Sequence, residues 1–99
     1  MSSRLQWTEE AFADLDRLEA FLYGKSSNAA IEAIDTILTA IQDLRDFPLI
    51  GRSLHNEDED DAYRELIVPF SNSGYLVLYV YDGQTVEIHR VRHQREAGY

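Results

Sequence analysis

The fold is decided by residues 64–92, which contain the runs Arg-Glu-Leu-Ile-Val-Pro-Phe (64–70), Tyr-Leu-Val-Leu-Tyr-Val-Tyr (75–81) and Thr-Val-Glu-Ile-His-Arg-Val (85–91). β-Branched and aromatic residues dominate these runs, which is typical of strands. The last two runs are separated by Asp82-Gly83, a strong hairpin signal because both central residues of such a turn must tolerate a positive φ. We therefore predict three consecutive antiparallel strands.

The run 75–81 carries apolar or aromatic residues on both faces, whereas a strand with one wet face alternates with polar residues. It is therefore expected to be the middle strand. Such a small meander cannot bury itself, so apolar residues elsewhere in the chain must cover at least one of its faces.

The first half of the chain supplies this cover. A helix is predicted from about Thr8, its N-cap, to Tyr23, and Gly24 is the expected C′ residue. Its polar residues, among them Asp14, are expected mostly on the wet side. The apolar positions recur at spacings of three and four and are Ala11, Phe12, Leu15, Leu18 and Leu22.

A second helix is predicted to follow after a tight link, with an N-cap among residues 26–28. It extends to about Asp46, where Phe47-Pro48 ends it because residues before proline avoid the α region. Its apolar stripe is formed by Ala30, Ile34, Ile37, Leu38, Ile41 and Leu44.

Two shorter segments complete the prediction. Residues 4–7 alternate and are expected to form a short strand that places Leu5 and Trp7 on one face. Residues 48–62 are expected to be irregular. The predicted class is α+β: an N-terminal short strand and a two-helix antiparallel hairpin packed on a small antiparallel β-sheet that ends in the three-stranded meander.

Length and composition limit the function. Ninety-nine residues with 44% hydrophobic residues predict a single domain spanning residues 1–99. The absence of cysteine excludes disulfides and thiolate chemistry. No apolar run approaches the length of a membrane span and the N-terminus lacks a signal-peptide pattern, so we expect a cytoplasmic protein without membrane contact.

The net charge of −9 is unevenly distributed. Residues 1–63 hold 14 acids and 5 bases, whereas residues 64–99 hold 4 of each. An acidic chain is a poor candidate for nucleic-acid binding, which depends largely on Lys and Arg neutralising phosphates. The acidic run Glu57–Asp61 lacks the alternating ligands and central glycine of a calcium loop, and His55 has no evident ligand partner. A solvated loop, no metal site and no cofactor are therefore expected.

The C-terminal segment 89–95 concentrates three arginines and two histidines. By strand alternation, Arg90 is expected on the same face as Val86 and Ile88, with Val91 on the other. Arg64 opens the first strand of the meander, so it is a candidate to lie near Arg90, and two guanidiniums together suit a phosphate or a partner carboxylate.

The alternative for these arginines is pairing with internal acids such as Glu65 or Glu87. His93, with Glu96 and Tyr99, is a candidate acid/base set for cleaving RNA through the 2′-hydroxyl. The alternative for this set is a surface histidine beside a frayed C-terminus.

Several motifs together resemble a known family. They are Trp7 with Ala11-x-x-Asp14-Leu15, Ala29-Ala30, Phe47-Pro48-Leu49-Ile50-Gly51-Arg52, Arg64-Glu65-Leu66-Ile67-Val68, Tyr75-Leu76-Val77-Leu78-Tyr79 and residues 86–95. In these the chain resembles the RelE/ParE superfamily of toxins from bacterial type II toxin–antitoxin modules. The resemblance implies a two-helix hairpin on a small antiparallel sheet, which agrees with the periodicities. It also implies a cognate antitoxin partner, and a homodimer or a toxin–antitoxin heterotetramer as the assembly.

The resemblance leaves two targets open. RelE-like members cleave mRNA in the ribosomal A site, and ParE-like members, associated with plasmid stabilisation, poison DNA gyrase. The chain is more similar to the ParE-like branch, because His93-Gln94-Arg95 resembles its His-Gly-Arg ending and Gln94 stands where some ribosome-dependent relatives have a catalytic tyrosine. The acidic run 57–61 also lies where the mRNA-cleaving branch tends to be basic.

A gyrase inhibitor that arrests growth is therefore the preferred interpretation, with Arg92, His93, Arg95 and Tyr99 as target-binding residues. The alternatives are an mRNA endonuclease that uses Arg64, Arg90 and His93 as catalytic residues, or an inactive relative that serves only as an interaction module.

Overall fold

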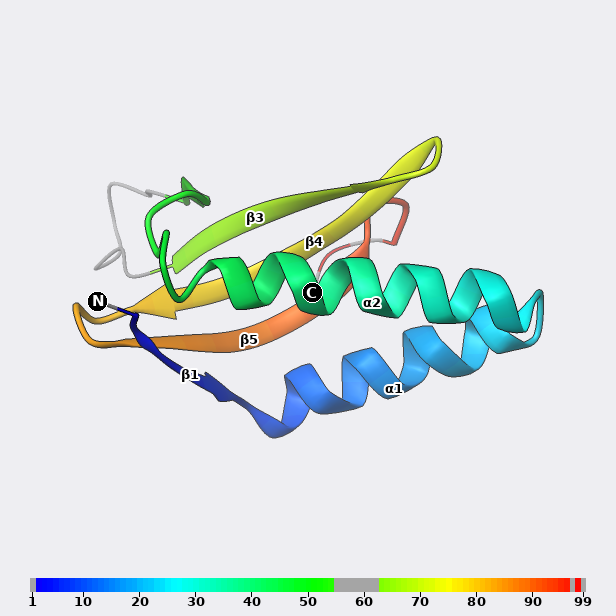
Figure 1. Ribbon diagram of the computed structural model, residues 1–99, viewed down its shortest axis with the longest axis horizontal. Coiled ribbons are helices and arrows are strands. Elements are labelled where there is room, and N and C mark those ends of the chain that lie inside the picture. The colour runs from blue at the N-terminus through cyan, green and yellow to red at the C-terminus, as the bar shows by residue number, and fades with distance from the viewer. Residues whose placement is uncertain (1, 55–62, 97, 99) are drawn as a thin grey trace.

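The computed structural model describes residues 2–54, 63–96 and 98, and the predicted α+β class is confirmed (Figure 1). The acidic run 57–61, His55 and Tyr99 lie outside the described residues. The elements follow the order β1 (Arg4–Trp7), α1 (Glu9–Tyr23), α2 (Ser27–Asp43), β2 (Arg52–Ser53), β3 (Tyr63–Phe70), β4 (Ser73–Tyr81) and β5 (Thr85–His93).

The strands form one sheet in the order β1-β5-β4-β3-β2, so β4 is its middle strand, as predicted. The meander β3–β4–β5 is antiparallel. The sheet as a whole is mixed, because β1 pairs in parallel with β5 and aligns Leu5 with Val86 and Trp7 with Ile88. This pairing adds the apolar face of β1 to the face that carries the core.

Strand β2 corrects the expectation that residues 48–62 contain no regular element. Arg52 pairs with Glu65 and Ser53 with Arg64, antiparallel to β3. Two residues carry too little pattern to be recognised as a strand, and the pairing is supported by an ion pair between the side chains of Arg52 and Glu65.

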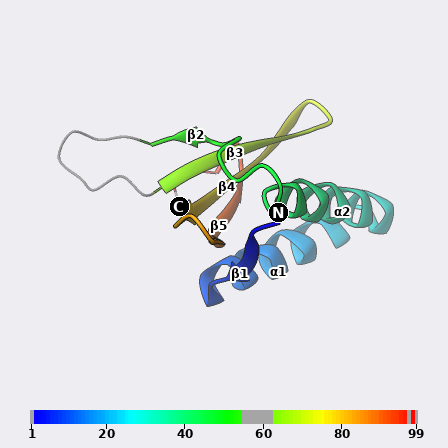
Figure 2. The same cartoon turned by 60° about the vertical axis from the view of Figure 1, so that its left-hand side comes forward.

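Both helices lie on the same side of the sheet (Figure 2), as the apolar stripes require. Thr8 and Ser26 are their N-caps, and each side-chain oxygen accepts a hydrogen bond from a backbone N–H of the first turn. Between the layers lies a core of buried side chains. It comprises Ala11, Leu18, Ala33, Ile37, Ile41, Leu44, Val68, Tyr75, Val77, Tyr79, Val86, Ile88 and Val91.

The helices differ from the prediction in detail. Phe12 and Leu38 belong to the predicted stripes but are 55% and 41% exposed, because the sheet occupies only a narrow sector of each helix. Phe12 instead stacks on Trp7. Helix α2 ends at Asp43 rather than Asp46, and Gly24 caps α1 with a right-handed φ of −63°, so it is not a left-handed C′ residue.

The β4–β5 hairpin is confirmed, but its central residues are Gly83 and Gln84 rather than Asp82 and Gly83. Gly83 alone in this turn has a positive φ, +97°, at the first central position, as a type II′ turn requires. Asp82 stands before it, and its Oδ1 accepts the backbone N–H groups of Gln84 and Thr85.

A register shift in β5 corrects the predicted alternation of its last residues. Tyr79 aligns with Ile88 but Leu78 aligns with Arg90, so the strand carries an irregularity at His89. After it, Val91 aligns with Val77 and lies in the core together with Val86 and Ile88. Arg90 therefore does not share their face, contrary to the prediction.

Candidate functional site

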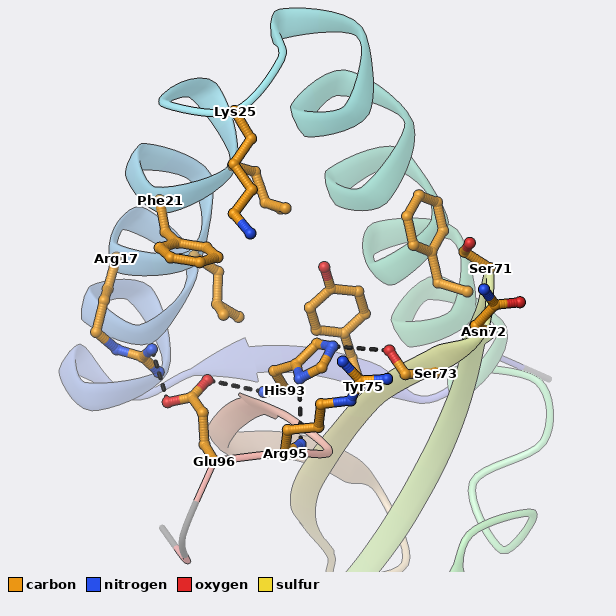
Figure 3. Close-up of a pocket in the computed structure, with 13 residues that line it drawn as sticks. Arg17, Phe21, Lys25, Ser71, Asn72, Ser73, Tyr75, His93, Arg95 and Glu96 are labelled. Atoms are coloured by element: carbon orange, nitrogen blue, oxygen red, sulfur yellow. Dashed lines mark hydrogen bonds and ion pairs between the residues drawn. The ribbon is translucent and has the colours of Figure 1, made fainter.

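A pocket of about 770 Å³ opens between the C-terminal half of α1, the β3–β4 turn and the residues that follow β5 (Figure 3). It contains both His93 and Arg95, two of the four residues predicted to bind the target. The apolar part of its lining comes from three elements and consists of Leu18, Phe21, Leu22, Phe70 and Tyr75. The site is thus an apolar groove with polar side chains around its mouth.

His93, at the end of β5, is held in one tautomer. Its Nδ1 accepts the backbone N–H of Arg95 at 3.1 Å, and its Nε2 lies 2.8 Å from the Ser73 hydroxyl. A ring nitrogen that accepts from an amide carries no proton, so in the neutral ring Nε2 carries it and donates to Ser73. The edge-to-face packing of Tyr75 further fixes the ring. In this tautomer His93 offers a hydrogen-bond donor at Nε2 and has no free ring nitrogen to act as a base.

Glu96 closes one side of the groove. Its Oε1 accepts the backbone N–H of His93 at 2.9 Å, and its Oε2 lies 2.8 Å from Arg17 of α1. Burial alone raises the pKa of Glu96, but the His93 N–H and the Arg17 guanidinium outweigh it and lower the pKa below its usual value. The carboxylate stays charged and ties the C-terminal turn to α1.

Two further cations stand at the groove. The Lys25 ammonium lies 5.0 Å from the centre of the Phe21 ring. Arg95 is exposed, and within the described residues its side chain makes no hydrogen bond or ion pair. Together with Arg17, these residues bring three of the nine Lys and Arg side chains of an acidic chain to one place.

Arg92 has a different position from His93 and Arg95. Its guanidinium NH1 donates to the backbone carbonyls of His93, Gln94 and Glu96, the last at 2.6 Å. It thus supports the turn that carries Arg95 and Glu96 and does not line the groove. Tyr99 lies outside the described residues.

Arg90 is paired with Asp14 of α1. Its Nε and NH2 donate to the two carboxylate oxygens at 2.7 and 3.1 Å, and the backbone N–H of Val91 donates to Oδ2 at 2.9 Å. Burial acts to raise the pKa of Asp14, but these hydrogen bonds and the charges of Arg90 and Arg17 lower it. Arg90 therefore pairs with an acid of the same chain, which was the alternative to binding a phosphate or a partner. The acid is Asp14 rather than Glu65 or Glu87.

Arg64 lies away from Arg90. It lies on β3 and aligns with Tyr79, whereas Arg90 lies on β5 and its guanidinium reaches Asp14 of α1. Its guanidinium NH1 donates to the carbonyl of Gly51 at 2.8 Å and to that of Leu49 at 3.3 Å. The structure therefore does not bring these two guanidiniums together, nor does it place either of them in the groove with His93.

Sequence reasoning missed three contributors. Asp14 was expected on the wet side of α1, yet it is only 5% exposed, and its place in the Ala11-x-x-Asp14-Leu15 motif was the available signal. Arg17 and Lys25 belong to the acidic half of the chain, so only the tertiary structure reveals that they meet the basic tail. In the described part of the chain, no group of three His, Cys, Asp or Glu side chains is placed to hold a metal ion, and no helix is long and apolar enough to cross a membrane.

Comparison with known proteins identifies the class. Residues 5–98 match the family described as the ParE toxin of the type II toxin–antitoxin system parDE. The chain belongs to this family and is a type II toxin of the RelE/ParE superfamily. It is 34% identical over 83 residues to Toxin RelE3 of Caulobacter vibrioides, covering 84% of this chain and 85% of the relative.

Two solved structures share the fold. The chromosomal ParDE system of P. aeruginosa matches with a TM-score of 0.72 at 20% identity, over 93% of this chain and 96% of that one. The RelBE2 toxin–antitoxin complex of Mycobacterium tuberculosis matches with a TM-score of 0.64 at 23% identity, over 95% and 100%. Because both branches of the superfamily occur among these relatives, the choice between their activities depends on the site.

Proposed function

We propose that the protein is a ParE-like toxin that inhibits DNA gyrase in the cytoplasm and is neutralised by a cognate antitoxin. The observation that carries this proposal is the separate engagement of Arg64, Arg90 and His93. Each is bonded to a different internal partner, Gly51, Asp14 and Ser73 respectively.

RNA cleavage needs a base, an acid and a cation on the same phosphate. Here the charge of Arg90 is neutralised by Asp14, and Arg64 on β3 donates to the carbonyls of Leu49 and Gly51. In the neutral ring of His93, the amide of Arg95 occupies Nδ1, so the proton is on Nε2, which faces Ser73. This arrangement favours binding over catalysis, with His93 and Arg95 as contacts for the target.

The antitoxin partner is supported by the relatives, since both structural neighbours are toxin–antitoxin systems. For this chain we propose a cognate antitoxin that protects the sheet and the helical hairpin, in a heterotetramer or on a toxin homodimer. Hydrogen exchange of the complex against the free protein tests this, and protection confined to residues 57–61 would contradict it.

The experiment for the target compares two activities of the purified protein. It is expected to inhibit supercoiling by gyrase or to trap cleaved DNA, while leaving ribosome-bound mRNA intact. His93→Ala is expected to weaken inhibition about fivefold rather than abolish it, since a peripheral contact contributes about 1 kcal/mol. Arg4→Gln, an exposed change away from the groove, is the matched control.

A second candidate, an mRNA endonuclease, is favoured by the position of His93 beside the cations Arg17 and Arg95. It predicts codon-resolved mRNA cuts that fall 100-fold or more with His93→Ala, as expected for an acid/base group. Cuts of this kind would contradict the gyrase proposal and favour the endonuclease. Normal growth after induction without antitoxin, with no partner copurifying, would contradict the toxin role.

A further inference from the structure

The groove combines an apolar floor with a cationic mouth. Its floor is apolar, with Phe21 62% exposed at one side and Tyr75 buried at the base. Its mouth carries Arg17, Lys25 and Arg95, although the chain as a whole has a net charge of −9. The surface therefore fits a ligand that is apolar and anionic at once.

Glu96 already supplies an anion at this mouth. Its carboxylate joins Arg17 at 2.8 Å, with the Arg17 side chain 47% exposed and that of Glu96 36% exposed. The contact spans from the C-terminal turn to α1, so it depends on the conformation of a short terminal segment. An incoming carboxylate would meet the same guanidinium, and it would gain the two cations that Glu96 does not pair with.

We propose that the groove receives an acidic, apolar segment of the target protein, and that Glu96 occupies the position of that segment's carboxylate in the free toxin. The inference rests on the proposed function in naming a protein target. Glu96 is then an internal competitor: binding requires its ion pair with Arg17 to be exchanged for one with the target.

A protein segment fits better than a nucleic acid. Binding to a polyphosphate depends on several cations that follow its backbone, whereas the cations of this groove are Arg17, Lys25 and Arg95 around an apolar floor. The apolar floor, in contrast, stabilises a bound segment that buries a leucine or aromatic side chain against it. Lys25 and Arg95 then supply charge complementarity at the edge of the contact, where it mainly affects the rate of association.

The first experiment measures binding of a short labelled peptide in which leucines are flanked by glutamates. Two other labelled ligands are measured for comparison. One is the same peptide with lysine in place of glutamate, and the other is an RNA oligonucleotide with the same net charge as the acidic peptide. Glu96→Gln keeps an acceptor for the His93 N–H but removes the ion pair, so it is expected to bind the acidic peptide about two- to fivefold more tightly. Arg17→Gln and Arg95→Gln are expected to weaken binding, and Arg4→Gln to leave it unchanged.

The opposite results overturn the inference. If Glu96 only stabilises the turn, Glu96→Gln leaves peptide affinity unchanged or lowers it, although thermal unfolding shows a folded protein. If the RNA binds the groove more tightly than the peptide and loses affinity with Arg95→Gln, the ligand is a nucleic acid.

Gyrase assays on the same variants separate the two proposals. If no variant inhibits gyrase but the acidic peptide binds with the expected order of affinities, the gyrase target is wrong and the groove assignment stands. If the wild-type protein inhibits gyrase and Glu96→Gln inhibits no more strongly, the role of Glu96 as competitor is wrong and the target stands.

Discussion

At the residue scale, Asp14 connects the helical layer to the sheet. Its carboxylate accepts three hydrogen bonds, one from the backbone N–H of Val91 at the edge of β5 and two from the Arg90 guanidinium. We expect Asp14→Asn to lower the free energy of unfolding by about 2 kcal/mol, because a buried hydrogen-bonded ion pair loses one charge and the amide cannot accept all three bonds. Urea unfolding measures this. Asp16→Asn, an exposed change on the same helix, is expected to remain within about 0.5 kcal/mol of wild type, and equal losses would contradict the role of Asp14.

Gly51 is a second position where a single atom matters. The hydroxyl of the buried Tyr79 accepts the Gly51 N–H at 2.9 Å and donates to the Pro48 carbonyl at 2.8 Å. A Cβ at position 51 would lie 2.6 Å from that hydroxyl and 3.0 Å from the backbone oxygen of Glu65. Gly51→Ala is therefore expected to destabilise the protein by about 2 kcal/mol in urea unfolding, since the core must shift to accept the methyl group.

The matched control is Gly24→Ala. Gly24 has a right-handed φ of −63°, which alanine adopts without strain, so a change within about 0.5 kcal/mol is expected. If Gly51→Ala were equally mild, the close approach of Tyr79 to the Pro48–Gly51 segment would not be maintained in solution.

At the scale of elements, the hydrophobic periodicities predict the two helices and the meander because those patterns follow from local geometry alone. They fail along β5 after Ile88. There α1 and its N-cap supply the hydrogen-bonding partners of the strand edge: the Thr8 hydroxyl donates to the His89 carbonyl and the Asp14 carboxylate accepts from the Val91 N–H. The irregularity that turns Val91 into the core lies at this junction. A tertiary contact of this kind leaves no periodic signal, so the alternation could not reveal it.

In the candidate site too, some residues can be predicted from the sequence and others only from the tertiary structure. His93 and Arg95 can be predicted as candidates from the composition of the tail and its resemblance to ParE-like endings, because a cationic cluster in an acidic chain is visible without a fold. Arg17 and Lys25 could not be assigned to the site, since on a helix rich in acids they resemble ordinary solvated charges. Only the tertiary structure, which places the C-terminal half of α1 across the groove from the β3–β4 turn, brings them to the site.

That turn carries strain that a substitution can relieve. Ser71 has a φ of +54°, in the left-handed region that costs a residue with a Cβ roughly 1 kcal/mol. We expect Ser71→Gly to raise the free energy of unfolding by up to about 0.5 kcal/mol, part of the gain being offset by the greater chain entropy of glycine in the unfolded state. Asn72→Gly, one residue further along the same turn and without a positive φ, is expected to be neutral or destabilising. The comparison is made by urea unfolding, and the reverse order would show that Ser71 is not strained.

At the scale of the whole molecule, two electrostatic effects act in opposite directions as the pH falls. At neutral pH the net charge is −9, so the excess carboxylates repel one another in the folded protein. Protonation of some carboxylates, as the pH falls towards the isoelectric point near 4.6, relieves that repulsion. The pKa values of Asp14 and Glu96 are lowered in the folded protein. Each therefore contributes stability that is present above its unfolded pKa, about 4, and is lost as the pH falls through its folded value.

Stability at low ionic strength is thus expected to be level or to rise slightly between pH 7.5 and 5, and then to fall steeply below about pH 4. Added salt should stabilise the protein at pH 7.5, where it screens repulsion between exposed charges. Urea unfolding across this range tests the profile, with Asp14→Asn as the diagnostic variant: it is less stable at neutral pH but loses less on acidification. If Asp14→Asn and wild type lose stability in parallel below pH 4, the acid sensitivity does not arise from the pair between Asp14 and Arg90, and other carboxylates must account for it.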